Sequence, residues 1–161
     1  MRRFIFMSLG LLVLAFSLSG IGANQSCPSG WFSHNVSCYK FFSNWTTWGE
    51  AQRICMEEQE GAQLASIKDL EESVKLSDEL SKTRNIFDVW IGLRFSKTKG
   101  IWLWNDGSQV THTRWEEGEP SKKECAVLIT RSRYLNWRTD TCRSWNMIVC
   151  KLQPQRQASG C

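Results

Sequence analysis

The sequence is poor in several residues on which common protein classes depend. Its 161 residues include three prolines, two histidines and two tyrosines, and basic residues occur in no run longer than a pair. The formal net charge of +4 is small, so nucleic-acid binding is not expected. With two histidines and no C-x-x-C pair, a zinc site is not expected either. Hydrophobic residues make up 42% of a chain whose length suits one domain, which excludes wholesale disorder.

Only one long hydrophobic run occurs, and it lies at the start of the chain. Arg2 and Arg3 precede the apolar residues 4–18, and small residues follow up to Ala23. This order of basic, apolar and small residues is typical of a secretory signal peptide. An N-terminal membrane anchor is the alternative, although the run is short for a spanning helix. We expect a signal peptide over 1–23 and a secreted, extracellular protein with no membrane insertion.

Secretion decides how the seven cysteines are interpreted. In an oxidising compartment an even set forms a disulfide framework, and an odd cysteine is a candidate for an intermolecular bond. Six cysteines can pair in many ways, so their number leaves the connectivity open. Secretion also makes the three Asn-x-Ser/Thr sequons, at Asn24, Asn35 and Asn44, candidate glycosylation sites.

The first half of the chain predicts two helices. Thr47 and Glu50 have the spacing of a capping box, and the helix that they begin should end near Gly61. A second helix should run from Ser66, with Asp69 three residues on, to about Lys82. Its buried stripe is predicted to contain Leu70, Val74 and Leu80, and Glu71 should pair with Lys75 on the exposed face.

The second half predicts strands and one long loop. Strands are expected over residues 36–42, 89–93, 101–104, 125–129 and 147–152, and residues 105–124 carry little regular pattern. A loop of this length inside a compact domain is usually functional. These elements predict a single α+β domain over 24–152, followed by a flexible polar tail over 153–161.

Several short motifs follow one another in a specific order. They are S-C-Y-K at 37–40, Trp48 with Ala51 and Cys55, G-A-Q-L-A-S-I at 61–67, W-I-G-L at 90–93, W-L-W-N-D-G-S at 102–108 and G-E-P at 118–120. In this order they resemble a C-type lectin-like domain, from Cys27 to about Leu152. The leader also resembles that of snake venom C-type lectins. The resemblance implies two helices packed on antiparallel sheets, a long irregular loop and three intrachain disulfides.

The resemblance also implies how the cysteines pair. It predicts bonds between Cys27 and Cys38, between Cys55 and Cys150, and between Cys125 and Cys142. Cys161 is then left unpaired on the tail, and the long loop holds no cysteine before Cys125. We therefore expect a disulfide-linked dimer through Cys161.

Sugar-binding members of the family hold a calcium ion, and this chain departs from their pattern. Calcium takes about six to eight oxygen ligands. Glu119 matches a family ligand, but Ser121 replaces the expected Asn or Asp. Lys123 stands where the family has a Glu, and Glu124 lies one residue beyond that position. In the alternative interpretation as a calcium-binding lectin, the degenerate site is Glu119, Ser121 and Glu124.

The last part of the calcium pattern is also lost. Where the family has Trp-Asn-Asp, this chain has Trp137-Arg138-Thr139. The positive charges of Lys123 and Arg138 oppose a divalent cation. The triplet Trp104-Asn105-Asp106 has the same residue types as the calcium triplet. It lies in the turn of the core motif, so it is expected to be structural. No calcium or other cofactor is predicted.

The resemblance then implies a binding protein and not an enzyme, because no catalytic string is present. The venom C-type lectin-like group acts on haemostasis by binding platelet receptors or clotting factors, and we expect a protein target of this kind without sugar binding. The alternative is a calcium-dependent mannose- or galactose-binding lectin that agglutinates cells. Mixed charge around a tryptophan suits protein contact, but core packing is the favoured interpretation of Trp115, and His112 is expected to be an ordinary surface residue. The contact candidates are His112, Arg114, Trp115, Glu116, Glu117, Lys122, Lys123, Arg131, Arg133 and Arg138.

Overall fold

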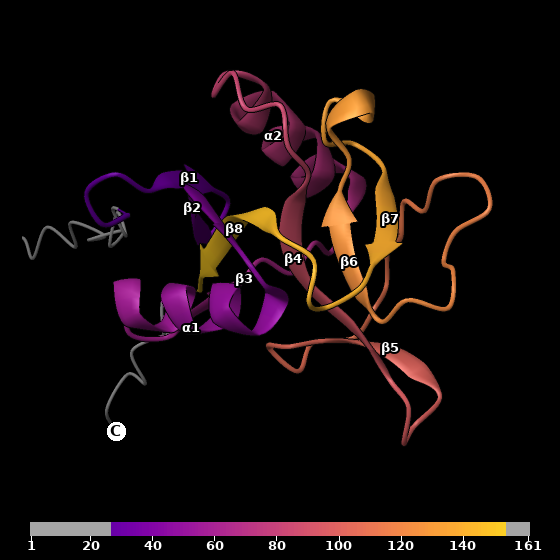
Figure 1. Ribbon diagram of the computed structural model, residues 1–161. Helices are drawn as coiled ribbons and strands as arrows, with labels where there is room; N and C mark the ends of the chain where they lie inside the picture. Colours follow the sequence, from indigo (N-terminus) through magenta and orange to yellow (C-terminus); the bar gives the residue numbers. More distant parts are fainter. Residues whose placement is uncertain (1–26, 154–161) are drawn as a thin grey trace, which may run out of the picture.

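A computed structural model describes residues 27–153. The predicted signal peptide, Asn24 and Cys161 lie outside this range. The α+β fold predicted from the sequence is confirmed: two helices, α1 (Trp48–Glu58) and α2 (Leu70–Ser81), pack on a mixed sheet (Figure 1). Within 27–153, no helix has the length and apolar character that a membrane crossing needs.

The sheet follows the order β1-β2-β8-β4-β6-β7, with β3 added to β8 and β5 to β4. Neighbouring strands are antiparallel except β4 and β8, which run parallel. The β1–β2 hairpin therefore lies at one edge and β7 at the other (Figure 1). The strands are β1 (Phe32–His34), β2 (Ser37–Thr46), β3 (Ala62–Leu64), β4 (Val89–Ser96), β5 (Ile101–Trp104), β6 (Cys125–Leu128), β7 (Trp137–Asp140) and β8 (Asn146–Leu152).

Helix α1 begins where the sequence predicts, but without the predicted capping box. Thr47 is its N-cap residue and makes no side-chain cap hydrogen bond. Glu50 instead accepts a hydrogen bond from Arg53, one turn further on, at 3.0 Å. The helix ends at Glu58, and Gly61 follows in the left-handed conformation.

Helix α2 is capped by Asp69, so the prediction that it starts at Ser66 is wrong. The Asp69 carboxylate accepts a hydrogen bond from the backbone N–H of Glu72 at 2.8 Å. Ser66 lies before the helix, and its hydroxyl donates to Asp106 at 2.5 Å. The Asp69 side chain thus satisfies a helix-start donor that Ser66 does not reach.

The buried face of α2 also differs from the prediction. Leu70 and Val74 are 51% and 43% exposed, while Glu72 and Ser73 turn inward with Leu76 and Leu80. The predicted pair of Glu71 with Lys75 does not form, because Lys75 lies 2.8 Å from Glu79. The buried face of α2 therefore combines the apolar Leu76 and Leu80 with a polar attraction between Glu72 and β8.

That attraction comes from a buried ion pair. Lys151 Nζ on β8 lies 2.5 Å from a carboxylate oxygen of Glu72, and both side chains are almost fully buried. Lys151 also donates to the Ser66 carbonyl at 3.0 Å, and the Tyr39 hydroxyl donates to Glu72. Burial lowers the pKa of Lys151, although the Glu72 charge opposes this effect. Satisfied buried charges of this kind lock neighbouring elements together.

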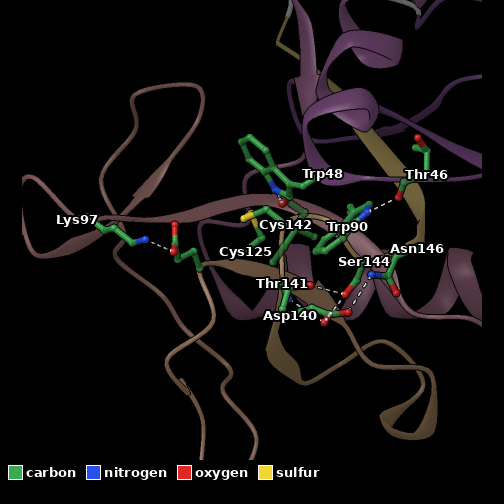
Figure 2. Close-up of a disulfide and its surroundings, with 12 residues drawn as sticks. Thr46, Trp48, Trp90, Lys97, Cys125, Asp140, Thr141, Cys142, Ser144 and Asn146 are labelled. Carbon is green, nitrogen blue, oxygen red and sulfur yellow. Dashed lines mark hydrogen bonds and ion pairs between the residues drawn. A yellow bond between two sulfur atoms is a disulfide. The ribbon is translucent and has the colours of Figure 1, made fainter.

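Three disulfides hold the sheet and helices in the pairing that the family resemblance implies. Cys27 is bonded to Cys38, Cys55 to Cys150 and Cys125 to Cys142. The second bond joins α1 to β8 across 95 residues of sequence, and the third joins β6 to the segment after β7. The long-loop region is therefore fixed covalently at its base (Figure 2).

The W-I-G-L motif forms the centre of the domain. Trp90 donates its indole N–H to the Thr46 carbonyl at 2.8 Å, as Figure 2 shows. A side chain at Gly92 would place its Cβ 2.1 Å from Asn105 Oδ1 and 2.6 Å from the Leu64 carbonyl. Only glycine fits this close approach, which explains why the motif contains it.

Candidate functional site

The long loop leaves β5, passes along β7 and returns to β6, so it lies at the far edge of the sheet. Its one regular contact is a parallel bridge between Trp115 and Trp137. There the Trp137 N–H donates to the Arg114 carbonyl at 2.7 Å, and the Glu116 N–H donates to the Trp137 carbonyl at 2.8 Å. These bonds seat the middle of the loop on the sheet.

Tryptophan packing reinforces this attachment. The Trp115 ring centroid lies 5.0 Å from that of Trp102 and 5.8 Å from that of Trp137. Trp115 is half-buried and packs against the main core, which matches the expected alternative that this residue is structural. It is not a freely exposed anchor for a partner.

His112 is also held inside this cluster. Its ring meets the edge of Trp137 at 5.8 Å, and its Nε2 lies 3.0 Å from the Ser73 hydroxyl on α2. Burial lowers the pKa of His112, and the Arg114 charge adds to this effect against Asp69 and Glu72. The interpretation of His112 as an ordinary surface residue is wrong, since it ties the loop to α2.

The carboxylate of Glu119, which matches a calcium ligand of the family pattern, accepts hydrogen bonds from within the protein. Its Oε2 accepts hydrogen bonds from the backbone N–H groups of Ser121, at 2.9 Å, and Thr139, at 3.0 Å. The Thr139 hydroxyl donates to the same oxygen, and Thr139 is 1% exposed. Burial alone would raise the pKa of Glu119, but these hydrogen bonds and the Lys123 charge lower it.

The basic residue that replaces a calcium ligand on β7 has partners of its own. Arg138 donates to Asp88 through Nε at 2.8 Å and through Nη2 at 2.6 Å. It also lies 3.6 Å from Asp140, and Lys123 approaches the same carboxylate at 3.7 Å. The two cations therefore occupy two of the sequence positions of the family's oxygen ligands, and each is paired with a carboxylate.

Asp140 anchors the end of β7 beside the Cys125–Cys142 bond. It accepts hydrogen bonds from the Thr141 N–H at 2.8 Å, the Ser144 hydroxyl at 2.9 Å and the Asn146 amide at 3.1 Å (Figure 2). Burial would raise the pKa of Asp140, but these bonds and the Arg138 charge lower it. Its oxygens are thus used within the fold.

The trio proposed for a calcium-binding alternative is only partly brought together. Ser121 lies beside Glu119, and its hydroxyl contacts that of Thr139. Glu124 instead pairs with Lys97 on the β4–β5 hairpin at 2.5 Å. Between residues 27 and 153, no cluster of three or more His, Cys, Asp or Glu side chains is arranged to hold a metal ion.

The Trp104-Asn105-Asp106 triplet is structural, as expected. Asp106 accepts from the Ser66 hydroxyl at 2.5 Å and from the Ser108 N–H at 2.9 Å. The Asn105 amide donates to Gln52 on α1. The triplet therefore joins the β5 end to α1 and to the segment before α2.

The remaining contact candidates lie around β7. Arg131 pairs with Glu116, with Nε 2.9 Å from Oε1, and Arg114 donates to Asn136 at 3.2 Å. Arg133 is exposed in a left-handed turn. The contact candidates Glu117, Lys122 and Lys123 are exposed.

Sequence reasoning missed Asp88, Thr139 and Asp140 as partners of the replaced calcium positions. Asp88 lies 50 residues before Arg138, and no spacing rule connects them. The sequence marks Thr139 only as a residue that replaces a calcium ligand of the family pattern. Their shared role follows from strand pairing, because β7 and β4 both flank β6.

Comparison with known proteins gives consistent matches over this range. The model of the lectin C-type domain matches residues 44–152. C-type lectin lectoxin-Phi1 from Philodryas olfersii is 69% identical over 155 residues, covering 94% of this chain and 99% of that protein. Snaclec 5 from Bitis arietans is 41% identical over 153 residues, covering 94% of this chain and 98% of that protein. The structure of human lithostathine aligns with a TM-score of 0.75 and 27% identity, covering 79% of this chain and 99% of that one.

Proposed function

Because the chain belongs to the lectin C-type domain family, we propose that it is a secreted snake C-type lectin-like toxin that binds a protein target without binding sugar. The snake relatives named lectoxin and snaclec support the toxin assignment. The domain acts by binding, and no enzymatic activity is proposed.

One observation supports the proposal that the protein does not bind sugar. Glu119, the ligand that survives from the calcium pattern, already accepts three hydrogen bonds from Ser121 and Thr139. Lys123 and Arg138 stand at two other ligand positions and are held by Asp140 and Asp88. Calcium would compete at Oε2 with these bonds, and the positive charge of the nearby Lys123 would oppose it. No calcium or other cofactor is therefore part of the proposed function.

The proposed targets are platelet receptors or clotting factors, so the protein would impair haemostasis. The contact residues are proposed to lie around the long loop and β7, where Arg114, Lys122, Lys123, Arg131, Arg133 and Arg138 gather. Trp115 contributes by holding the loop in place and not by direct contact. Arginines around a rigid scaffold are typical anchors of protein interfaces.

A dimer linked through Cys161 completes the proposal. All six cysteines within 27–153 are used in intrachain bonds, which leaves Cys161 for a partner chain. Electrophoresis with and without reductant should show a dimer that the Cys161→Ser variant lacks. A monomer in the unreduced wild-type protein would contradict this part of the proposal.

Calorimetry with calcium, together with mannose and galactose columns, tests the central statement. The purified protein should give no binding heat with calcium and should pass through both columns. It should change platelet aggregation or clotting time in the presence of free sugar.

A second candidate function is a calcium-dependent lectin that agglutinates cells, and the retained Glu119-Pro120 pair favours it. Calcium binding together with elution from mannose by EDTA would establish that function and refute the first.

A further inference from the structure

Two turns from different parts of the chain meet at one end of the sheet. Residues 83–88 join α2 to β4, and residues 129–136 join β6 to β7. The Tyr134 hydroxyl donates to the Asn85 carbonyl at 2.7 Å, and the Thr130 N–H donates to Asp88 at 2.8 Å. Both turns rise beside the end of α2 in Figure 1. They therefore form one continuous surface.

The backbone of these turns adopts an uncommon conformation. Arg84, Arg133 and Tyr134 have φ angles of 55°, 54° and 65°, in the left-handed region that favours glycine. Arg133 is held there by the Ser77 hydroxyl, which donates to its carbonyl at 2.6 Å. Non-glycine residues in this region gather at binding sites more often than elsewhere.

An exposed isoleucine lies at the centre of the surface. Ile86 is 75% exposed. It lines an open hollow of about 490 Å³ together with Asp88, Ile129, Thr130, Arg131 and Arg138. A single exposed apolar side chain is ordinary, but one beside a hollow lined by arginines has the composition of an interface centre.

The charged side chains that line the hollow are paired, and the unpaired charge on the two turns is positive. Arg138 is paired with Asp88, and Arg131 with Glu116. Arg84 and Arg133 are exposed and form no ion pair with any residue of 27–153. Two unpaired cations therefore lie on the two turns that line the hollow. We call Arg84, Ile86, Arg131, Arg133 and Arg138 the arginine-turn surface.

We propose that the arginine-turn surface docks an acidic segment of the protein target, with an apolar target side chain against Ile86 and carboxylates against Arg84 and Arg133. This inference rests on the proposed function and names the part of the domain that carries it. It assigns contact to the two turns and to Arg138 on β7, and it leaves Lys122 and Lys123 out of the contact. The hollow favours a protein segment over a membrane, because Ile86 lies there among fixed charges of both signs.

The test measures binding of a labelled peptide, acetyl-Glu-Asp-Leu-Glu-Asp-amide, by fluorescence anisotropy on the purified protein. Ile86→Ser should weaken binding about tenfold, because the leucine loses its apolar contact. Arg133→Asn should weaken it about threefold, since asparagine keeps the left-handed turn and removes an exposed charge. Raising the salt concentration should weaken wild-type binding.

Two matched variants serve as controls. Val36→Ser removes an isoleucine-like side chain that is 79% exposed on the β1–β2 turn, at the other edge of the sheet. Arg143→Asn removes an exposed arginine outside the two turns. Both should bind the peptide as the wild type does, and near-ultraviolet circular dichroism should show that all four variants are folded.

Several results would overturn the inference. They are equal binding by Ile86→Ser and the wild type, equal loss in Val36→Ser, and equal binding of a control peptide in which lysines replace the four acidic residues. If Ile86→Ser abolishes self-association in sedimentation, the occupant is a second copy. If it abolishes binding to phosphatidylserine vesicles but not to the peptide, the occupant is a membrane.

Failure of this inference is distinguishable from failure of the proposed function. The variants Ile86→Ser and Arg133→Asn are compared with the wild type in clotting and platelet aggregation assays. If their effect is as strong as that of the wild type, the arginine-turn surface is refuted while the proposed function stands. If the wild type acts on neither system and is retained by mannose with calcium, both are refuted.

Discussion

Replacing Glu119 by alanine should lower the free energy of unfolding by about 2–3 kcal/mol, with or without calcium. The substitution removes the acceptor for two N–H groups and one hydroxyl. Ser121 is exposed and can turn to water, but Thr139 is 1% exposed and cannot. A hydrogen bond to a charged group contributes about 1.5–3 kcal/mol, and bonds to one carboxylate are not additive. The expected loss is therefore close to that of one such bond, about 2–3 kcal/mol.

The assay is urea unfolding followed by tryptophan fluorescence, with the disulfides intact. For a domain of this size, the expected loss moves the midpoint by about 1–2 M urea. Glu119→Gln keeps one acceptor oxygen and should lose about half as much. Glu117→Ala removes a neighbouring exposed carboxylate and should stay within about 0.5 kcal/mol of the wild type.

The contribution of Glu119 should also depend on pH. Its pKa in the folded protein lies below the ordinary value, because hydrogen bonds and the Lys123 charge outweigh burial. The stabilisation is thus complete above the unfolded-state pKa and is lost as the pH falls through the folded-state pKa. The stability difference between the wild type and Glu119→Gln should shrink on acidification below about pH 4.5.

A specific result would refute this reasoning. If Glu119 serves as a calcium ligand and does not stabilise the calcium-free fold, Glu119→Ala will be as stable as the wild type in EDTA. Calcium will then stabilise the wild type alone, by an amount that grows with its concentration. That pattern would also favour the lectin as the correct function.

Three further predictions concern the scaffold. Glu72→Gln should cost about 3–5 kcal/mol in urea unfolding, because it leaves the Lys151 ammonium buried without its counter-charge; a loss below about 1 kcal/mol would show that the pair is dispensable. Gly92→Ala should destabilise the domain by about 3 kcal/mol or more, since its Cβ would meet the Leu64 carbonyl, and a melting temperature equal to that of the wild type would contradict the close approach. Loss of the Cys55–Cys150 bond in a double alanine variant should cost about 3–5 kcal/mol, and calorimetry that finds an unchanged melting temperature would disprove its role.

Much of the fold could be predicted because its elements carry local signals. Trp48, Ala51 and Cys55 face the core at helical spacing, and residues 89–93 form a buried strand as the apolar run indicates. β1 and β7 were not predicted, because both are short and contain polar residues. Their positions depend on pairing with β2 and β6, which no local window contains.

The errors on α2 have a different origin. Leu70 and Val74 have the spacing of a buried stripe, yet Glu72 is buried in their place. The reason is Lys151, which lies 79 residues away in sequence and draws Glu72 inward. A hydrophobic pattern cannot show a polar contact made across the domain.

The candidate site was predictable in its residue identities but not in its internal bonds. The departures at Ser121, Lys123 and Arg138 are visible in the sequence once the family pattern is known. That Asp88 holds Arg138 and that Thr139 holds Glu119 depends on strand neighbours. The arginine-turn surface has no sequence signature, since its residues belong to two separate turns that are joined by the Tyr134–Asn85 and Thr130–Asp88 hydrogen bonds.

The strand order also determines how linked copies would face their targets. Cys27 is bonded to Cys38, and Cys38 pairs with Leu152, so both ends of the described chain leave from the β2 side. The long loop and the arginine-turn surface lie at the β7 edge. In two copies joined through the segment that follows residue 153, each copy would keep these surfaces at the sheet edge opposite its β2 side. Against a receptor displayed in many copies on one cell, such a pair gains strength from effective concentration, without any change in the surface itself.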